Sequence, residues 1–305
     1  MDQERPVRYI HRMSRNGLAL FVAMSVIWGI PYFLIRIAVS EISPATLVFA
    51  RTAAGALILM PIVLARGGLR AIGGKWLPLL AFAVVEIGGP WFFLSSAEQH
   101  ISSSLAGLLV SSVPLVGIIV APLFGNRERI SPVGIVGLVV GLCGVAAIVG
   151  LDLGVLDAAA FLQMALVAIG YAVGPAILRR YLADVPSVSV IGVSLAACAV
   201  AYTPLAAAQW PQAVPGTAVL ASVGVLAVVC TAIAFLLFFA LISEIGPVRA
   251  TVITYVNPAV AAVVGIAVLH ETFTLGMGIG FVLVLAGSIL ATRRRPGAAR
   301  GDSSR

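Results

Sequence analysis

The sequence predicts an all-α membrane protein with ten transmembrane helices, arranged as two inverted five-helix repeats. Three observations lead to this fold class: the composition, the positions of the few charged residues, and an internal repeat. Of the 305 residues, 61% are apolar and only 10% are charged, with a mean hydropathy of +1.10. Because an average soluble protein has about 25% charged residues, this composition excludes a soluble enzyme, a disordered protein and a DNA-binding domain.

Ten apolar stretches each have the ~20 residues that a helix needs to cross the hydrocarbon core of a bilayer. They are apolar on all sides, whereas the strands of a β-barrel alternate in polarity. The first stretch is too long for the apolar part of a signal peptide, so we expect it to be retained. Glycines, prolines and charged clusters separate the expected helices, which are residues 17–38, 44–65, 76–97, 102–124, 132–150, 157–179, 187–209, 217–243, 248–269 and 274–292.

Basic residues fall almost entirely on one side of the predicted membrane. With ten spans both termini share a side, and the segments on that side contain 17 of the 19 Lys and Arg residues. The opposite loops contain none, while Arg36 and Arg51 lie within or at the ends of spans. Because cytoplasmic segments are enriched in Lys and Arg, we predict a multi-pass protein of the plasma (bacterial inner) membrane with both termini in the cytoplasm. This topology explains the net charge of +7 without a nucleic-acid partner.

The second half of the chain repeats the first. A shift of 143 residues aligns residues of like type, and a one-residue adjustment aligns one further proline pair: Arg36 with Arg179, Glu41 with Asp184, Glu128 with Glu271, Gly137 with Gly280, Gly144 with Gly287, and Pro114 with Pro258. Each repeat holds five spans, an odd number, so the second repeat must enter the membrane in the opposite sense. Inverted repeats of this kind build many secondary transporters, whose substrate site lies near the midplane between the halves. The expected parts are a cytoplasmic tail (1–16), two repeats (17–150 and 157–292) and a second cytoplasmic tail (293–305).

An ordered set of residues resembles the EamA family of the drug/metabolite transporter superfamily. The set is Trp28-Gly29, Arg51, Pro114, Glu128, Gly137 and Gly144 in the first half, and Pro258, Glu271, Gly280 and Gly287 in the second. The resemblance covers about residues 17–292 and implies a secondary carrier of small organic molecules, more often an exporter. The second half departs from the pattern, because Tyr171-Ala172 replaces the Trp-Gly pair and Ser194 stands where Arg51 has its counterpart. We therefore expect the two halves to contribute unequally to the site.

Glu86, near the middle of the third span, is the most informative residue. An ionised carboxylate at the bilayer centre costs roughly 2.5–3.5 kcal/mol or more, so it must be paired, protonated or in contact with water. It either relays protons or binds a substrate ammonium group, or else it is a structural partner of Arg51 or of the backbone. Gly88, Gly89 and Pro90 follow it, and they form either a hinge that exposes carbonyl groups or a site of close helix packing.

Arg51 lies at a comparable depth in the second span. The depths of Arg51 and Glu86 differ by roughly 6 Å at the helical rise of about 1.5 Å per residue, which a long side chain can bridge. One hypothesis is that the two form a polar pair at a central cavity. The alternative is that Arg51 extends toward the membrane surface or caps helix carbonyl groups.

Further candidates for the site are polar and aromatic residues within spans. Tyr255 and Asn257 precede Pro258, which we expect to interrupt the ninth span, and Ser112 with Pro114 forms a related feature in the fourth. These features line the cavity, act as hinges, or are ordinary proline kinks, which are common in membrane helices. Residues that could form cavity walls are Trp28, Tyr32, Trp91, Gln163 and Tyr171, although Gln163 fits a hydrogen bond between helices better than a ligand contact.

Charged residues near span ends have a simpler interpretation. Arg36, Arg179, Glu128 and Glu271 are predicted to cap helices or to fix loops. A polar turn of Glu98, Gln99 and His100 with three serines separates the third and fourth spans.

Two kinds of sequence motif are missing, and their absence limits the possible energy sources and enzymatic activities. The sequence has no Walker-type phosphate-binding loop, so ATP is not its direct energy source, and proton coupling, exchange and facilitated diffusion stay open. The three cysteines are far apart within apolar stretches, which predicts no disulfide, metal or cofactor. A membrane enzyme would need a metal site or an activated nucleophile, which the sequence does not show. A receptor or scaffold with a transporter-derived fold is a second rival.

The sequence therefore predicts a secondary transporter that works by alternating access. Its expected partners are a small organic metabolite or drug, membrane lipid and, if Glu86 relays protons, protons. One Glu and one Arg in a cavity would suit a zwitterion such as an amino acid. The substrate, the direction of transport and the oligomeric state are left open by these patterns.

Overall fold

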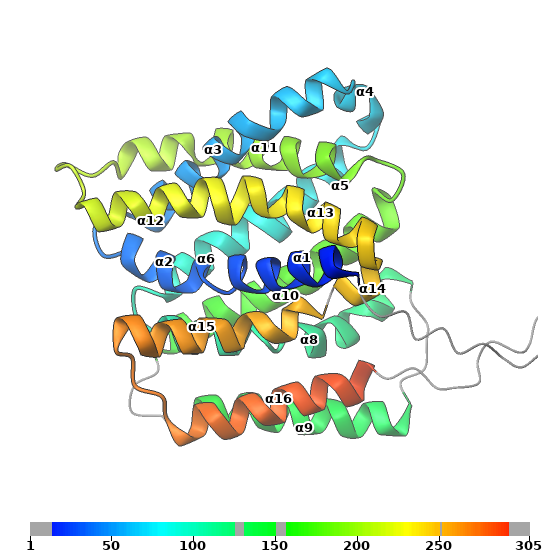
Figure 1. Ribbon diagram of the computed structural model, residues 1–305, viewed down its shortest axis with the longest axis vertical. Helices are drawn as coiled ribbons and strands as arrows, with labels where there is room; N and C mark the ends of the chain where they lie inside the picture. Colours follow the sequence, from blue (N-terminus) through cyan, green and yellow to red (C-terminus); the bar gives the residue numbers. More distant parts are fainter. Residues whose placement is uncertain (1–13, 126–130, 151–156, 251, 293–305) are drawn as a thin grey trace, which may run out of the picture.

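The computed structural model is a bundle of helices whose long axes run roughly side by side (Figure 1). It describes residues 14–125, 131–150, 157–250 and 252–292. Nine helices in these ranges are long and apolar enough to cross a membrane, and a tenth apolar helix, Ile253–Leu269, is shorter. No β-strand occurs in the described ranges, so the all-helical membrane fold is confirmed there, and most of the expected boundaries are met within two residues.

The first five spans follow the expected order. Their elements are α1 (Arg15–Ile27) and α2 (Pro31–Ala38); α3 (Pro44–Ala65); α5 (Trp76–Phe82), η1 (Ala83–Gly88) and α6 (Gly89–Ala97); α7 (Ser103–Val110), α8 (Val113–Val120) and η2 (Ala121–Phe124); and α9 (Pro132–Gly150). A short helix, α4 (Gly68–Ile72), lies between the second and third spans.

The second set of five repeats this layout. Its elements are α10 (Ala158–Tyr181); α11 (Ser187–Ala208); α12 (Thr217–Ala227), η3 (Val228–Ile233) and α13 (Ala234–Ile245); α14 (Pro247–Ala250) and α15 (Ile253–Leu269); and α16 (Leu275–Thr292). The described chain begins and ends at one end of the bundle (Figure 1). We call this the terminal end, and we call the other end, where α6 is followed by α7, the opposite end.

Helices begin where the sequence supplies a side-chain cap. The hydroxyl groups of Ser14, Ser43 and Ser102 each accept a hydrogen bond from the backbone three residues on, and the Asp157 carboxylate accepts one two residues on. Such caps satisfy N–H groups that have no partner within the helix. They fix the starts of α1, α3, α7 and α10, all close to the predicted positions.

Internal symmetry extends to an irregular feature of the backbone. The third and eighth spans each contain one turn of π-helix, η1 and η3, and these turns lie 145 residues apart. A π-turn carries one extra residue and leaves backbone groups without their usual partners, and it is frequent at functional sites. Its recurrence at equivalent places indicates that the repeat seen in the sequence is also a repeat of three-dimensional structure.

Spans one and six differ, although both contain a proline at equivalent places. The first span is broken into α1 and α2 at residues 28–30, just before Pro31, whereas α10 continues through Pro175. We expected an unbroken first span. The break places Gly29 against Val260 of α15, where an added Cβ would lie 2.5 Å from the valine side chain. Close contact between spans one and nine thus depends on a glycine at this kink.

The ninth span is helical where we expected an interruption. Helix α15, which begins at Ile253, continues through Tyr255, Asn257 and Pro258, so the expected interruption at these residues is wrong. The Asn257 amide supports the uninterrupted turn: in the orientation that satisfies it, Nδ2 donates to the carbonyl of Ile253 (2.9 Å) and to that of Ser25 on α1 (3.1 Å). In the fourth span the break does fall as expected, between α7 and α8, at Ser111 and Ser112.

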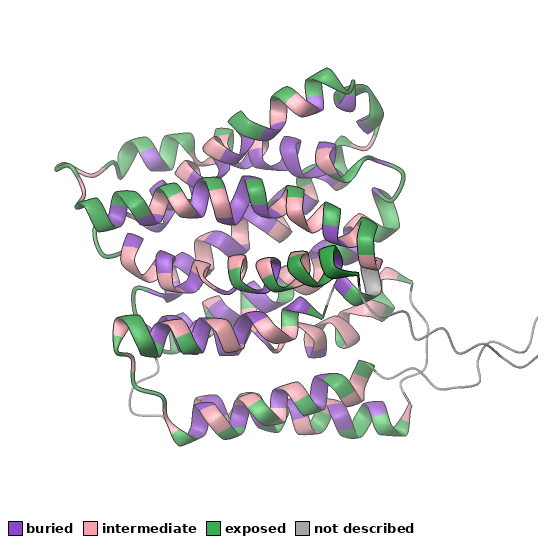
Figure 2. Ribbon diagram, in the orientation of Figure 1, coloured by how far each residue is buried: buried purple, intermediate pink, exposed green. Residues whose placement is uncertain are grey.

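Helices α9 and α16 form a closely packed pair at one side of the bundle (Figure 1). An added Cβ at Gly144 would lie 2.7 Å from the Gly280 carbonyl oxygen and 2.7 Å from the Val284 nitrogen, and at Gly137 it would lie 2.7 Å from the Gly287 carbonyl oxygen. We call this contact the glycine seam. Both helices have many exposed residues (Figure 2), and several of these are large apolar residues, as expected against lipid.

Replacing Gly144 with alanine should destabilise the protein, because the new methyl group would meet backbone atoms that cannot move aside alone. Overpacking of this kind typically costs about 1–3 kcal/mol. Thermal unfolding of the detergent-purified protein would show a lower midpoint. Gly117→Ala on α8 is the matched control, since an added Cβ there meets nothing within 4 Å. Equal midpoints for the two variants would contradict the role of the seam.

Candidate functional site

Arg51 is a buried cation held by an aromatic ring. It lies on α3, is 4% exposed, and its guanidinium carbon lies 3.9 Å from the centroid of the Trp91 ring on α6. Its Nε has no hydrogen-bond partner. A cation over a desolvated indole face gains about 2 kcal/mol or more. The charge is therefore positioned by Trp91 and keeps a donor free.

The polar pair of Arg51 and Glu86, one of the two hypotheses for Arg51, is not among the ion pairs of the described residues. Among the described residues the ion pairs are Lys75 with Asp184 and His100 with Asp157, and both lie in loops or at helix ends. Sequence depth alone suggested the pair, but a side chain's direction depends on rotation about the helix axis. In the structure Arg51 turns to Trp91, and Glu86 packs against α10 of the second repeat.

Glu86 lies within the π-turn η1 and fits into space left by a glycine. An added Cβ at Gly174 on α10 would lie 2.7 Å from Glu86 Cβ and 2.8 Å from its Cδ, and closer still to Oε2. Oε2 is buried and has no hydrogen-bond partner. Glu86 is therefore an acid at mid-span with an unused acceptor, held between the third and sixth spans.

Side chains of α11 satisfy backbone groups of the π-turn beside Glu86. The Tyr202 hydroxyl donates to the Gly88 carbonyl at 2.9 Å, and the Cys198 thiol to the Ala83 carbonyl at 3.3 Å. Pro90 lies in the first turn of α6, and α10 approaches it through Gly170, where an added Cβ would lie 2.6 Å from Pro90 Cγ. The irregular backbone supports the interpretation that Gly88, Gly89 and Pro90 form a hinge, and the contact with α10 supports close helix packing. A hinge motion itself stays a prediction.

Two tyrosines complete the cluster around Arg51 and Glu86. Tyr171 on α10 lies within electrostatic range of both charged groups, and the Trp91 indole is close enough to be its hydrogen-bond donor. Tyr32 on α2 is 6% exposed and interacts with Tyr171. We call Tyr32, Arg51, Glu86, Trp91 and Tyr171 the central cluster. The first four come from the first repeat and Tyr171 comes from the second.

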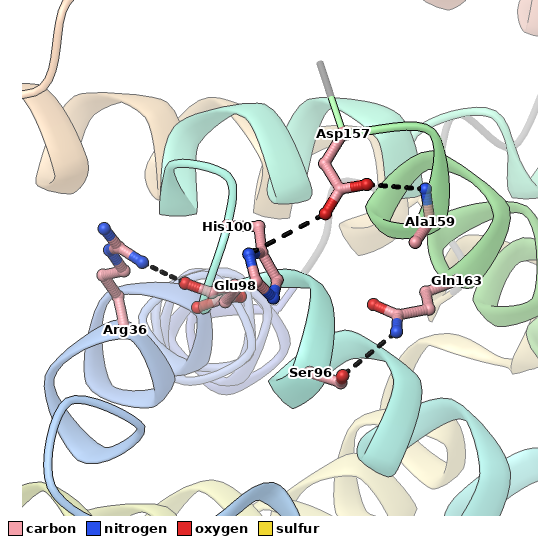
Figure 3. A network of polar contacts seen from close by, with 7 residues as sticks. All are labelled: Arg36, Ser96, Glu98, His100, Asp157, Ala159 and Gln163. Atoms are coloured by element: carbon pink, nitrogen blue, oxygen red, sulfur yellow. Dashed lines mark hydrogen bonds and ion pairs between the residues drawn. The ribbon is translucent and has the colours of Figure 1, made fainter. Parts of the chain in front are cut away.

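Several other candidates hold helices together and lie outside the central cluster. Trp28 packs on Phe235 and Phe238 of α13, with ring centroids 5.9 Å and 4.7 Å apart. Gln163 donates to the Ser96 hydroxyl at 3.0 Å, as expected of a residue that joins helices (Figure 3), although its Oε1 has no partner. The Ser112 hydroxyl donates a hydrogen bond to the Leu109 carbonyl, three residues earlier in the chain. Tyr255 is half-buried on α15.

The predicted capping role of Glu271 is confirmed, and it joins the two repeats. Its carboxylate accepts hydrogen bonds from the backbone N–H groups of Ser103 and Ser104, both at 2.8 Å, and from their hydroxyl groups. These N–H groups belong to the first turn of α7, so a residue of the second repeat caps a helix of the first. Its repeat counterpart, Glu128, lies outside the described residues.

Sequence reasoning missed Glu98, which ends α6 at the opposite end of the bundle. From the sequence, Glu98 was placed only in a polar turn between the third and fourth spans, but in the structure it is 0% exposed and neither carboxylate oxygen has a hydrogen-bond partner. The Arg36 guanidinium donates to its backbone carbonyl (Figure 3). An arginine predicted at a span end beside an acidic turn was the only signal that this region is closed.

Two cavities lie along α3, toward its two ends. One, of about 510 Å³, lies toward the terminal end between α3, α11 and α13, and Arg66 and Phe239 are among its lining residues. The other, of about 280 Å³, lies between α3, α12 and residues 210–215, and reaches Ala50, the neighbour of Arg51. Arg51 of the central cluster therefore lies on a helix that lines a cavity toward each of its ends.

These features define a polytopic helical membrane protein of internally repeated structure with charged groups buried between its spans. The model of the EamA-like transporter family matches residues 15–150 and again residues 158–293. The chain therefore belongs to the EamA-like transporter family, and its class is that of membrane transporters.

Two relatives are named as transporters, and a solved structure shares the fold. The chain is 29% identical over 286 residues to the "Uncharacterized inner membrane transporter YedA" of Escherichia coli (strain K12), covering 89% of this chain and 91% of that protein. It is 30% identical over 123 residues to an "Uncharacterized transporter" of Archaeoglobus fulgidus, 40% of this chain and 43% of that one. A crystal structure with 21% identity shares the fold with a TM-score of 0.65, covering 90% of this chain and 96% of that chain.

Replacing Gly174 with alanine should displace Glu86 and destabilise the protein, because the added methyl group overlaps the carboxyl group. Alanine is the better helix former by about 1 kcal/mol, so a lower unfolding midpoint would report the overlap and not helix propensity. The measurement is thermal unfolding in detergent. Gly224→Ala on α12 is the control, since no atom lies within 4 Å of an added Cβ there. A midpoint for Gly174→Ala at or above that of Gly224→Ala would contradict the placement of Glu86.

Proposed function

We propose that this transporter is a secondary carrier that exports a small zwitterionic organic molecule, such as an amino acid, by alternating access between its two repeats. One observation carries the substrate class: Arg51 is buried and Glu86 is half-buried with a buried Oε2, the two do not pair, and each keeps a polar atom without a hydrogen-bond partner. An unpaired buried charge is costly unless hydrogen bonds satisfy it. A ligand with one acidic and one basic group would supply both partners.

Aromatic groups of the central cluster would complete the binding site. Trp91 already lies against the Arg51 guanidinium, and Tyr171 reaches toward both charges from the second repeat. A site between repeats is what alternating access needs, because rocking of one repeat against the other then opens it to each side in turn. The two cavities along α3 and the matching π-turns in spans three and eight support this motion.

The chain has no phosphate-binding loop for ATP. Transport would therefore proceed by proton coupling, by exchange or by facilitated diffusion. Export is favoured by the family resemblance. The named relative of Escherichia coli is an inner membrane transporter, and the distribution of basic residues supports a cytoplasmic location for both termini.

Substrate transport should depend on both charges of the central cluster. Purified protein in liposomes would be screened for transport of amino acids and small aromatic compounds, with and without a pH gradient. Arg51→Gln and Glu86→Gln should each lower transport at least tenfold, since a lost charged contact of about 1.4 kcal/mol or more gives that factor. Thr203→Val is the control, because this exposed hydroxyl only bonds its own helix.

Two results would contradict the proposal. If both variants transported a substrate as well as the wild type does, the cluster would not hold the substrate. If the wild type bound compounds but never moved them, a receptor function would be favoured. Transport that ignores the pH gradient and survives Glu86→Gln would remove a proton-relay role from Glu86.

The proposed topology is tested by reporter fusions. Green fluorescent protein attached to the C-terminus should fluoresce, and alkaline phosphatase there should be inactive, because the terminus is cytoplasmic. Fusions after Gln212, in the exposed linker between α11 and α12, should give the reverse result. The same reporter active at both positions would show that the helix count or the orientation is wrong.

A further inference from the structure

Glu98 is a carboxyl group sealed within the opposite end of the bundle. It immediately follows α6, and its relative exposure is 0%. Both carboxylate oxygens are buried without a hydrogen-bond partner. Buried polar side-chain atoms usually have at least one partner, so a carboxyl group with none demands a physical reason.

Neighbouring donors are present but are directed elsewhere. The Arg36 guanidinium donates its hydrogen bond to the backbone carbonyl of Glu98 and not to its carboxylate. The His100 ring is directed to Asp157, with Nδ1 3.8 Å from Oδ2 (Figure 3). The nearby Glu271 carboxylate is occupied by the four donors of Ser103 and Ser104. No side chain of the described residues donates a hydrogen bond to either carboxylate oxygen of Glu98, and the backbone hydrogen bond with Arg36 that lowers its pKa is a smaller effect than burial, which raises it.

The electrostatic surroundings favour the neutral acid. Burial raises the pKa of Glu98 well above its usual value, and the negative charge of Glu271 raises it further, while Arg36 and Arg51 act in the opposite direction. The groups that face Glu98 from the elements around it are Arg36 and Tyr32 of α2, Arg51 of α3, Tyr171 of α10 and Glu271 after α15. A metal ion is a poor alternative, because His, Cys, Asp and Glu side chains of the described residues nowhere gather in groups of three.

We propose that Glu98 is a proton-binding residue of the carrier, which must be protonated before the opposite end of the bundle can close. This inference rests on the proposed function, in which that end faces the outside. When the end is open, water reaches the carboxylate and one proton passes from water to a carboxylate oxygen. Closure then buries a neutral group. The ionised form is compatible only with the open end, so external protons favour closure.

The contacts of Glu98 explain why it would sense this motion. Its backbone is tied to α2 by Arg36, and the adjacent start of α7 is tied to the second repeat by Glu271. If the repeats separate at this end, the groups that surround Glu98 on α2 and after α15 both move relative to it. Proton binding and gate closure are then linked, because only one of the two protonation states tolerates burial.

Infrared spectroscopy of the purified protein tests the protonation state without any substrate. The wild type at neutral pH should show the C=O stretching band of a protonated carboxyl group, and Glu98→Gln should lose one component of that band. Glu86→Gln is the matched control, which should keep the Glu98 component. Absence of a protonated carboxyl band from the wild type, or an unchanged band in Glu98→Gln, would overturn the proposal.

Stability provides a second readout. A carboxyl group whose folded-state pKa is raised stabilises the closed fold below its unfolded pKa and loses that contribution as the pH rises. The unfolding midpoint of the wild type should therefore fall more steeply above pH ~4.3 than that of Glu98→Gln, which stays neutral. Failure of Glu98→Gln to fold where the wild type folds would overturn the proposal, since glutamine has the shape of the neutral acid.

Transport gives the functional readout once the liposome screen has identified a substrate. The wild-type rate should change with external pH, whereas Glu98→Gln should be pH-independent and should retain at least half of the wild-type substrate exchange at equal pH on both sides. An unaltered pH dependence in Glu98→Gln would overturn the role of Glu98 while leaving the carrier function intact. A failed screen would contradict the carrier function, while the infrared result would still decide whether Glu98 holds a proton.

Discussion

The need to satisfy backbone hydrogen bonds inside a bilayer is the constraint on which this structure depends. In lipid no water is available to an unpaired N–H or C=O group, so spans must be helical and any irregular turn needs protein partners. The π-turn η1 obtains them from Tyr202 and Cys198 on α11, and in η3 the Thr231 hydroxyl donates to the Leu226 carbonyl at 2.8 Å. Irregular backbone is therefore supported by side chains of a neighbouring span in η1 and by a side chain of the same span in η3.

Much of the fold could be predicted from the sequence, because bilayer thickness fixes helix length and charged residues avoid the hydrocarbon core. The starts of α3, α5 and α11 lie at the predicted residues Pro44, Trp76 and Ser187. Properties that depend on rotation about a helix axis could not be predicted. Depth along the spans brought Arg51 and Glu86 together, but their directions differ, and the closed surroundings of Glu98 arise from α2 and from the loop after α15, far away in sequence.

The two repeats share a backbone plan but not a chemistry. The π-turn places Glu86 in the third span where its counterpart in the eighth has Thr231, and the kink of span one has no equal in α10. Repeated backbone gives a site between the halves, whereas unequal side chains place most of its charge on one half. The second repeat contributes Tyr171 and the glycine that leaves room for Glu86. A symmetric scaffold thus carries an asymmetric site.

The glycine seam has a consequence for the origin of such a chain. Gly137 and Gly144 on α9 meet Gly287 and Gly280 on α16, so each helix presents the same spacing to the other in antiparallel order. A surface that recognises a copy of itself in this way is an isologous interface, the kind that builds two-fold dimers. The chain therefore contains within one polypeptide the contact by which two separate five-span subunits of opposite orientation would assemble.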